Sequence, residues 1–425
     1  MKKIAKIVGI FSIILMLVGF VFYSAVHKEI PKGEQGEAAD KLASKMLNAL
    51  EYKAFENTEI IEWTFRGSHH YKWFKQKGIV RVKWGNNTVI LNTKDKKNSE
   101  VFIDGVNVDS QEFIEKAESY FNNDSFWIVA PYKVFDKGTK RSIVNENGKD
   151  LLLVTHTSGG STPGDSYLWE IDKNGFPIHF KMWVDILPIG GIEATWNNLF
   201  QAKSGIFLPK KHTLSLFNFV IPIENINAYN PNADATAKKI LDAIRHENYK
   251  NTNFLEWGFA GRRHYKWNKY DNIVDVFWDS IQVKLPTKKT TKSTVFINNI
   301  KQQKSHKRFI RKAERMFNND SFWLAAPHKL FDKGTYRFLK DENGTTKLFI
   351  KYTTGGSTPG DTYAWSFDEN YVPLYYEMYI PSMKINGKKA TWEQWTTTKS
   401  GTLLPKSHTF ENGRVLSMGD VKGYN

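Results

Sequence analysis

NNDSFWIVAPYKVFDKGT occupies residues 122–139, and NNDSFWLAAPHKLFDKGT occupies residues 318–335. The two eighteen-residue stretches differ at only four positions. A match of this length is typical of an internal repeat. Whatever fold one copy adopts, we expect the other copy to adopt as well.

The match extends far beyond this phrase, since Ala39–His212 aligns with Ala233–His408. A unit of about 180 residues is much longer than the ~20–50-residue period of solenoids and propellers, so it predicts a whole domain present twice. The stretch 221–232 is rich in Asn with two prolines and predicts a linker. The expected organisation is an N-terminal membrane segment (residues 1–30), a first repeat domain (31–222), a linker (223–232) and a second repeat domain (233–425).

Composition narrows the classes of function. The chain has 425 residues, no cysteine and a formal net charge of +16. The lack of cysteine excludes disulfides, thiol catalysis and Cys-ligated zinc. The positive charge favours anionic partners such as lipid head groups, acidic glycans or nucleic acid.

The N-terminus predicts export. Lys2, Lys3 and Lys6 precede Ile7–Ala25, nineteen residues without a charge. That length suits one membrane-spanning helix, and the lysines favour a cytoplasmic N-terminus. A cleavable signal peptide is the alternative. In both cases we expect the main body outside the cytoplasm, on the periplasmic side of the inner membrane, which makes nucleic acid an unsuitable partner.

Within each unit most hydrophobic residues alternate with polar ones, as Val80, Val82 and Trp84 do. This pattern predicts antiparallel strands with one apolar face. Two amphipathic helices are expected, one around Leu42–Leu50 and one around Phe113–Phe121 with a capping box at Asp109 and Glu112. The fold class is therefore α+β, with covering helices in each repeat. Asp124 is expected to cap a further short helix.

Twelve of the fourteen tryptophans fall at six matched positions of the repeat. They can pack a solid core, or line a cavity in a curved sheet. The sequence leaves both open. The candidate cavity residues are Trp63, Trp73, Trp84 and Trp169, with Trp257, Trp267, Trp278 and Trp365 in the second unit.

The stretch SGGSTPGDS (residues 158–166) has glycines at P-loop spacing, but Asp165 stands where a lysine is required, and Asp361 repeats this in the second unit. A carboxylate there would repel phosphate, so the stretch predicts a hairpin loop. Asp165 and Asp361 are candidates for contact with a ligand or partner.

His70 and His264 recur at matched positions and are further loop or partner candidates. His70 could meet His212 and Asp165 in an acid–base site, although a surface histidine is the ordinary case. No metal-ligand spacing or cofactor motif is present, so no catalytic residue, metal or cofactor is predicted.

The second helix of the second unit is basic, with Arg308 and Arg311 where the first unit has Glu112 and Glu115. A solvated face is one interpretation. An anionic membrane surface or acidic glycan as partner is the other.

The repeat resembles exported bacterial domains that are similar to the LolA/LolB-like periplasmic lipoprotein carriers. The resemblance is carried by the leading helix, the DSFW…AP…FDKGT phrase, the GGSTPGD hairpin and the closing KSGxxLPxxH strands. It implies two tandem antiparallel half-barrels, each covered by helices and holding acyl chains. It implies no catalytic residues. The tandem arrangement and the N-terminal anchor depart from a soluble shuttle.

Three hypotheses follow from the sequence. The first is a membrane-anchored, non-enzymatic binding protein for a lipid or lipoprotein. The second is an envelope hydrolase that uses His70 and His264 with nearby carboxylates. The third is a structural or protein-interaction module whose tryptophans fill a core.

Overall fold

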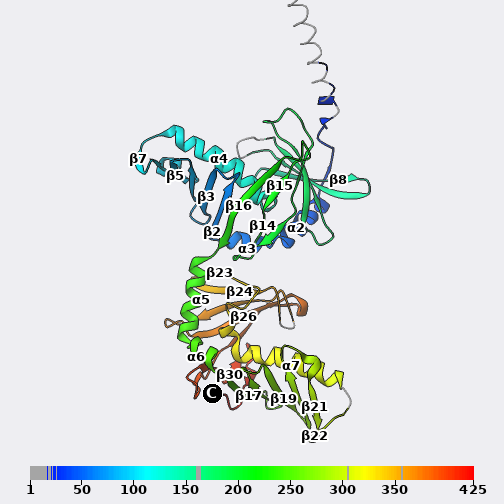
Figure 1. Ribbon diagram of the computed structural model, residues 1–425, viewed down its shortest axis with the longest axis vertical. Coiled ribbons are helices and arrows are strands. Elements are labelled where there is room, and N and C mark those ends of the chain that lie inside the picture. The colour runs from blue at the N-terminus through cyan, green and yellow to red at the C-terminus, as the bar shows by residue number, and fades with distance from the viewer. Residues whose placement is uncertain are drawn as a thin grey trace, which may run out of the picture. The chain divides into compact units, whose positions relative to one another are not determined.

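The computed structural model describes residues 17, 21, 23, 24, 26–158, 164–303, 306–355 and 358–425. The chain divides into two compact units, Met1–Tyr229 (unit 1) and Asn230–Asn425 (unit 2). Figure 1 labels their elements. Each unit is mainly antiparallel sheet with a few helices, which agrees with the α+β class.

Unit 1 is built around two larger sheets and one small one, as far as the described residues go. The first sheet has the order β15-β16-β2-β3-β4-β5-β6-β7. Its strands are β2 (Ile60–Phe65), β3 (His69–Phe74), β4 (Ile79–Trp84), β5 (Asn87–Asn92), β6 (Glu100–Ile103), β7 (Val106–Val108), β15 (Lys211–Thr213) and β16 (Val220–Tyr229).

The second sheet of unit 1 has the order β1-β8-β9-β10-β11-β12, and β13 pairs with β14. The strands are β1 (Glu34–Gln35), β8 (Thr139–Glu146), β9 (Lys149–His156), β10 (Ser166–Ile171), β11 (Pro177–Trp183), β12 (Ile192–Thr195), β13 (Leu199–Gln201) and β14 (Phe207–Pro209).

The two longer helices of unit 1 pack on these sheets. α2 contacts β8 and β9, whereas α4 contacts β5 and β6. Their buried residues form one stripe each, such as Ile114, Ala117 and Phe121 of α4. The helices are α2 (Glu37–Ala49), α3 (Tyr52–Asn57) and α4 (Gln111–Val129), with short 3-10 helices η1 (Lys96–Asn98) and η2 (Ala130–Lys133).

In unit 2 the described residues form two larger sheets, β22-β21-β20-β19-β18-β17-β32 and β23-β24-β25-β26-β27, and the pairs β28-β29 and β30-β31. The first sheet contains β17 (Phe254–Phe259), β18 (Arg263–Asn268), β19 (Ile273–Trp278), β20 (Ile281–Pro286), β21 (Thr294–Ile297), β22 (Ile300–Lys301) and β32 (Lys422–Tyr424). The other strands are β23 (Thr335–Glu342), β24 (Thr345–Tyr352), β25 (Thr362–Phe367), β26 (Pro373–Ile380), β27 (Ile385–Thr391), β28 (Thr396–Thr397), β29 (Leu403–Leu404), β30 (Ser407–Thr409) and β31 (Val415–Ser417).

The helices of unit 2 follow the same plan as those of unit 1. α5 contacts β23 and β24, and α7 contacts β20 and lies along the first sheet (Figure 1). The helices are α5 (Pro231–Ala243), α6 (His246–Asn251) and α7 (Lys307–Ala325), with η3 (Thr290–Lys292), η4 (Ala326–Lys329) and η5 (Pro381–Met383).

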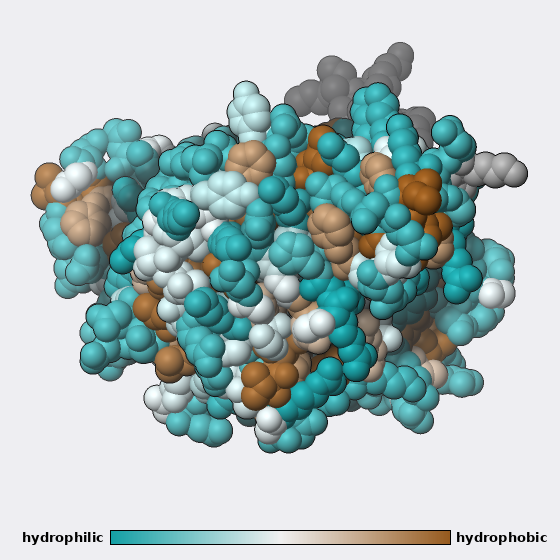
Figure 2. Space-filling view, turned by 90° about the horizontal axis from the view of Figure 1, so that it is seen from below, coloured by the Kyte–Doolittle hydropathy of each residue, from teal (hydrophilic) through white to brown (hydrophobic). Residues whose placement is uncertain are grey.

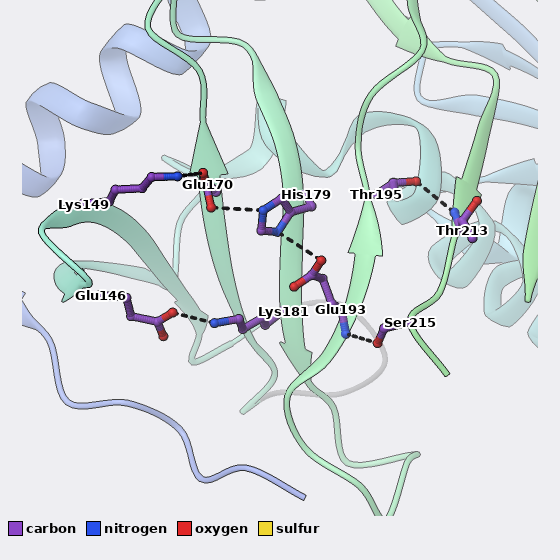
Figure 3. Close-up of polar contacts among 9 residues, drawn as sticks. All are labelled: Glu146, Lys149, Glu170, His179, Lys181, Glu193, Thr195, Thr213 and Ser215. Carbon is purple, nitrogen blue, oxygen red and sulfur yellow. Dashed lines mark hydrogen bonds and ion pairs between the residues drawn. The ribbon is translucent and has the colours of Figure 1, made fainter. Parts of the chain in front are cut away.

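Strand alternation separates an inner apolar face from an outer charged one. On the outer face of β9–β12, Lys149 pairs with Glu170 at 2.8 Å and Glu170 with His179 at 3.0 Å (Figure 3). Trp169 and Phe180, the residues next to Glu170 and His179 along their strands, point to the other face and are buried. The buried apolar face sets the register of the sheet, and the cross-strand charge pairs on the outer face add a small stabilisation.

Glycine is required where the repeated phrase ends. Gly138 and Gly334 have φ values of +85° and +81°. A Cβ at either position would collide with the Ser158 or Thr354 side chain. Only glycine combines this backbone angle with so close an approach, which explains its place in both copies.

Several local expectations are wrong. The predicted linker 223–232 is taken up by β16 and the start of α5, because β16 pairs with β2. The helix N-cap is Ser110, without a side-chain cap, rather than a capping box at Asp109. Asp124 lies inside α4 instead of capping a new helix, because its carboxylate finds partners on β3.

The predicted membrane segment Ile7–Ala25 lies almost wholly outside the described residues. No helix that the described residues form is long and apolar enough to cross a membrane. On the face drawn in Figure 2, hydrophobic side chains form small patches between hydrophilic ones. Such scattered exposure is normal for a folded protein.

Candidate functional site

Each unit contains a cavity. The cavity of unit 1 has a volume of about 940 Å³ and that of unit 2 about 520 Å³. Both volumes are typical of sites for small organic ligands.

The two cavities share part of their lining, which comes from matched positions of the repeat. The repeated phrase supplies two adjacent aromatic rings from the end of α4 or α7, and β10–β11 or β25–β26 supply the facing wall. The matched lining residues are Asn122/Asn318, Phe126/Phe322, Trp127/Trp323, Asp165/Asp361, Tyr167/Tyr363 and Met182/Met378.

The aromatic wall is held by ring packing. The Phe126 ring lies 4.5 Å from the Tyr167 ring, and the Phe322 ring 4.8 Å from the Tyr363 ring, measured between centres. Trp323 packs against both hydrophobic clusters of unit 2. The cavity wall is therefore continuous with the core and largely formed before any ligand binds.

A buried histidine fixes the backbone at the tryptophan. His212 Nδ1 lies 2.7 Å from Thr195 O, and its Nε2 lies 2.6 Å from Trp127 O. In unit 2, His408 Nδ1 lies 2.7 Å from Thr391 O. Burial lowers the pKa of His212, and it lowers the pKa of His408 to about 4. These histidines position the cavity wall and do not line it.

Asp165 and Asp361, predicted as loop residues, are buried in the cavity walls. The Tyr167 hydroxyl donates to Asp165 Oδ2 at 3.1 Å, and the Asp185 N–H donates to Oδ1 at 3.2 Å. Asp361 accepts a short hydrogen bond from Thr358. Burial raises the pKa of Asp361, which weakens its charge inside the cavity.

A second buried carboxylate stands on α4 and α7. Asp124 Oδ2 accepts from the Tyr71 hydroxyl at 2.6 Å and lies 2.7 Å from His69 Nδ1. Asp320 accepts from Tyr265, and Arg263 Nε lies 3.0 Å from its Oδ2. Burial raises the pKa of Asp320, although the Tyr265 hydrogen bond and Arg263 oppose this.

Of the two roles that the sequence left open for the eight candidate tryptophans, the structure places them in core packing. Trp63 stacks on Tyr71 with ring centres 4.5 Å apart, and Trp169 lies 5.1 Å from Trp196. Trp84, Trp257, Trp278 and Trp365 are also buried, and Trp73 and Trp267 are partly buried against Phe121 and Phe317. None of these eight belongs to the lining of the two cavities described above. The reason is that α4 and α7 cover the strand faces on which many of them stand.

His70 and His264 lie on the outer side of β3 and β18 and are exposed. His70 Nδ1 lies 3.0 Å from Thr64 Oγ1, and the His264 ring contacts Phe277. Within the described part of the chain, no carboxylate pairs with either histidine, and the contact with Asp124 belongs to the neighbouring His69. Arg308 and Arg311 are exposed on α7, as the sequence suggested.

No family model and no curated protein matches the sequence. Among the solved structures that are similar to this chain are two of low sequence identity. A DUF1329 family protein from Desulfovibrio piger is 9% identical, with a TM-score of 0.27, over 46% of this chain and 93% of that one. A domain described as an outer membrane lipoprotein-sorting protein, from Vibrio parahaemolyticus, is 11% identical, with a TM-score of 0.23, over 44% and 93%. These scores describe a distant likeness and say nothing about ligand or activity.

Phe126, Trp127, Tyr167 and Met182 line the unit 1 cavity but were not among the candidate cavity residues. The signal that points to them is the repetition of the phrase itself. The identical rings Phe126/Phe322 and Trp127/Trp323 mark the part of each unit that surrounds the cavity.

Proposed function

We propose that each unit binds an amphiphile, a lipid or a lipidated molecule, in its cavity without chemical conversion. In this proposal the chain is an extracytoplasmic binding protein, anchored by the uncharged segment Ile7–Ala25. The two units are half-barrels of the lipoprotein-carrier type that arose by tandem duplication.

The observation that carries the proposal is the matched lining of the two cavities. Phe126, Trp127 and Met182 and their counterparts offer rings and a thioether to an acyl chain. Each buried methylene contributes about 0.8 kcal/mol. Asn122 and Asn318 are polar groups on the same walls, which suits a molecule with one polar end.

The hydrolase alternative has less support. It needs a base, and His70 and His264 face away from the carboxylates. His69 does contact Asp124, but arginine replaces it in unit 2, and arginine is no base at neutral pH. A binding role accommodates this difference between the units.

The proposal is tested by photo-crosslinking on the full chain in nanodiscs. Diazirine-bearing fatty acids are added, and the labelled peptides are mapped by mass spectrometry. We expect label on peptides that contain Trp127 and Trp323. Trp127→Ala is expected to reduce the unit 1 label about tenfold, because an aromatic contact of about 1–2 kcal/mol is lost.

Trp73→Ala is the matched control, since Trp73 is also partly buried but stands outside the cavity lining. It is expected to leave the label unchanged. Labelling spread evenly over the protein, or an equal loss in both variants, would exclude the cavity as the binding site.

A further inference from the structure

The cavity of unit 1 extends along a wall that the cavity of unit 2 lacks. Ser68 and His69, before and at the start of β3, and Ser119 and Tyr120 of α4 line the larger cavity. Their counterparts in unit 2 are absent from the lining of the smaller one. This wall is one part of the difference between about 940 Å³ and about 520 Å³, and a second part lies at Lys133, Asp136 and Lys137, whose counterparts are also absent from the smaller lining.

Each of the four residues named on this wall differs between the two units. Ser68, His69 and Ser119 are replaced by Arg262, Arg263 and Arg315, and Tyr120 by Met316. Phe126, Trp127, Tyr167 and Met182 are unchanged at their matched positions. The shared part of the cavity differs at three further matched positions, His156/Tyr352, Val184/Ile380 and Leu214/Phe410, whereas all four residues named on the extra wall are replaced.

In unit 2, Arg263 takes the place of His69, which lines the extension of the unit 1 cavity along β3 and α4. Two contacts hold its side chain there. Its Nε lies 3.0 Å from Asp320 Oδ2, and its guanidinium carbon lies 4.4 Å from the centre of the Phe259 ring. Phe65, the counterpart of Phe259, lines the cavity of unit 1. The guanidinium therefore covers a ring that the other unit exposes to the cavity.

His69 contacts Asp124, the counterpart of Asp320, but its smaller side chain leaves this part of the cavity wall open. It lies 2.7 Å from Asp124 and stacks on Tyr120 with ring centres 4.0 Å apart. Histidine is shorter than arginine. Arginine cannot be neutralised in a protein, so Arg263 is not expected to leave the buried Asp320 and make room for a ligand.

We infer that the residue at 69 or 263 sets the length of ligand that each unit accepts. Unit 1 takes amphiphiles with long apolar chains, and unit 2 is restricted to shorter ones. This inference rests on the proposed function, since it concerns the selectivity of the same cavities.

The test uses the full chain in nanodiscs with two diazirine probes, one on a decanoate and one on a stearate chain. Decanoate is expected to label both units, and stearate only unit 1. Arg263→His is expected to admit stearate to unit 2, and His69→Arg to remove it from unit 1, each with a change of at least about tenfold. His70→Arg adds the same group on the outer face of the same strand and is expected to change nothing.

The outcomes separate the two proposals. If neither probe labels either cavity, the proposed function fails and the inference fails with it. If both probes label both units equally, or if the exchanges at 69 and 263 leave the chain-length preference unchanged, binding stands and the inference is overturned. Ser119→Arg is a second way to close the extension should His69→Arg fail to fold.

Discussion

The His69 Nδ1 atom lies 2.7 Å from Asp124 Oδ2, and at the matched place in unit 2 the Arg263 Nε atom lies 3.0 Å from Asp320 Oδ2. Both carboxylates are almost completely buried. Their partners differ in kind, because histidine can lose its charge and arginine cannot. The stability of unit 2 is therefore expected to depend more strongly on Asp320 than the stability of unit 1 depends on Asp124.

The first prediction concerns Asp320→Asn and Asp124→Asn. In unit 2 the change leaves Arg263 charged and unpaired, which should cost about 3 kcal/mol of stability. In unit 1 the partner is a histidine, a residue type without a permanent charge, so the loss of stability should be about 1 kcal/mol. Hydrogen exchange of peptides from α7 and α4 measures the two losses in one chain. Equal losses would show that the charge on residue 263 is not what makes the carboxylate necessary.

The second prediction concerns acid stability. Burial lowers the pKa of His328 from 6.5 to about 3. The unfolded chain then binds more protons at this site between these values, so the stability that the neutral ring contributes is full above pH 6.5 and is lost as the pH falls towards 3. Tyr132 occupies the matched position in unit 1. His328→Tyr should therefore reduce the loss of stability of unit 2 in acid, by about 3 kcal/mol at pH 4.5.

Tyrosine fits this site because of how its counterpart is held. Tyr132 stacks on Phe55 at 4.2 Å, and His328 on Tyr249 at 4.1 Å. Hydrogen exchange of the η4 peptide at pH 7.5 and pH 4.5 measures the effect. His264→Tyr, at an exposed position, is the control. If the stability of the η4 peptide against hydrogen exchange falls between pH 7.5 and pH 4.5 by the same amount in His328→Tyr as in the unchanged protein, the prediction is contradicted.

The third prediction concerns a repeated arginine that ties the leading helix to the sheet. Arg337 Nε donates to Asp234 Oδ1 at 2.7 Å, and its Nη1 donates to Leu330 O at 2.7 Å. A lysine cannot make both contacts, so Arg337→Lys should lower the free energy of unfolding of unit 2 by about 1–2 kcal/mol. Amide hydrogen exchange of the α5 peptides measures this loss.

Arg141→Lys is the matched variant in unit 1. Arg141 makes the corresponding bonds to Asp40 and Val134 O, but Asp40 is 52% exposed whereas Asp234 is 32% exposed. Better solvated charges interact more weakly, so the smaller loss is expected here. A larger loss in Arg141→Lys than in Arg337→Lys would argue against solvation as the deciding factor.

Some features could be predicted because they depend on local chemistry. The turn at Asp172–Gly175 is an example: Asp172 Oδ1 accepts from the N–H groups of Asn174 and Phe176 at 2.8 Å. The buried stripe of α2, with Met46 and Leu47, is another. In both, residues a few positions apart determine the structure.

Other features could not be predicted because they depend on which elements meet. The stretch 223–229 has the composition of a linker, yet β2 offers it a free edge with which to pair. His69 and His70 are adjacent, and the sequence favoured His70. Only the position of α4, which brings Asp124 to one face of β3, decides that His69 has the carboxylate.

The sequence by itself determined the repeat, the antiparallel α+β class and the places of the main helices, since alternation, helical stripes and turn residues act over short distances. The tertiary structure alone decided which aromatic residues enclose space. Trp63 and Trp127 have the same side chain, but Trp63 lies between its sheet and α4, whereas Trp127 stands at the end of α4 where the packing leaves a cavity. Whether a ring fills a core or lines a cavity depends on what covers it, and no local pattern contains that information.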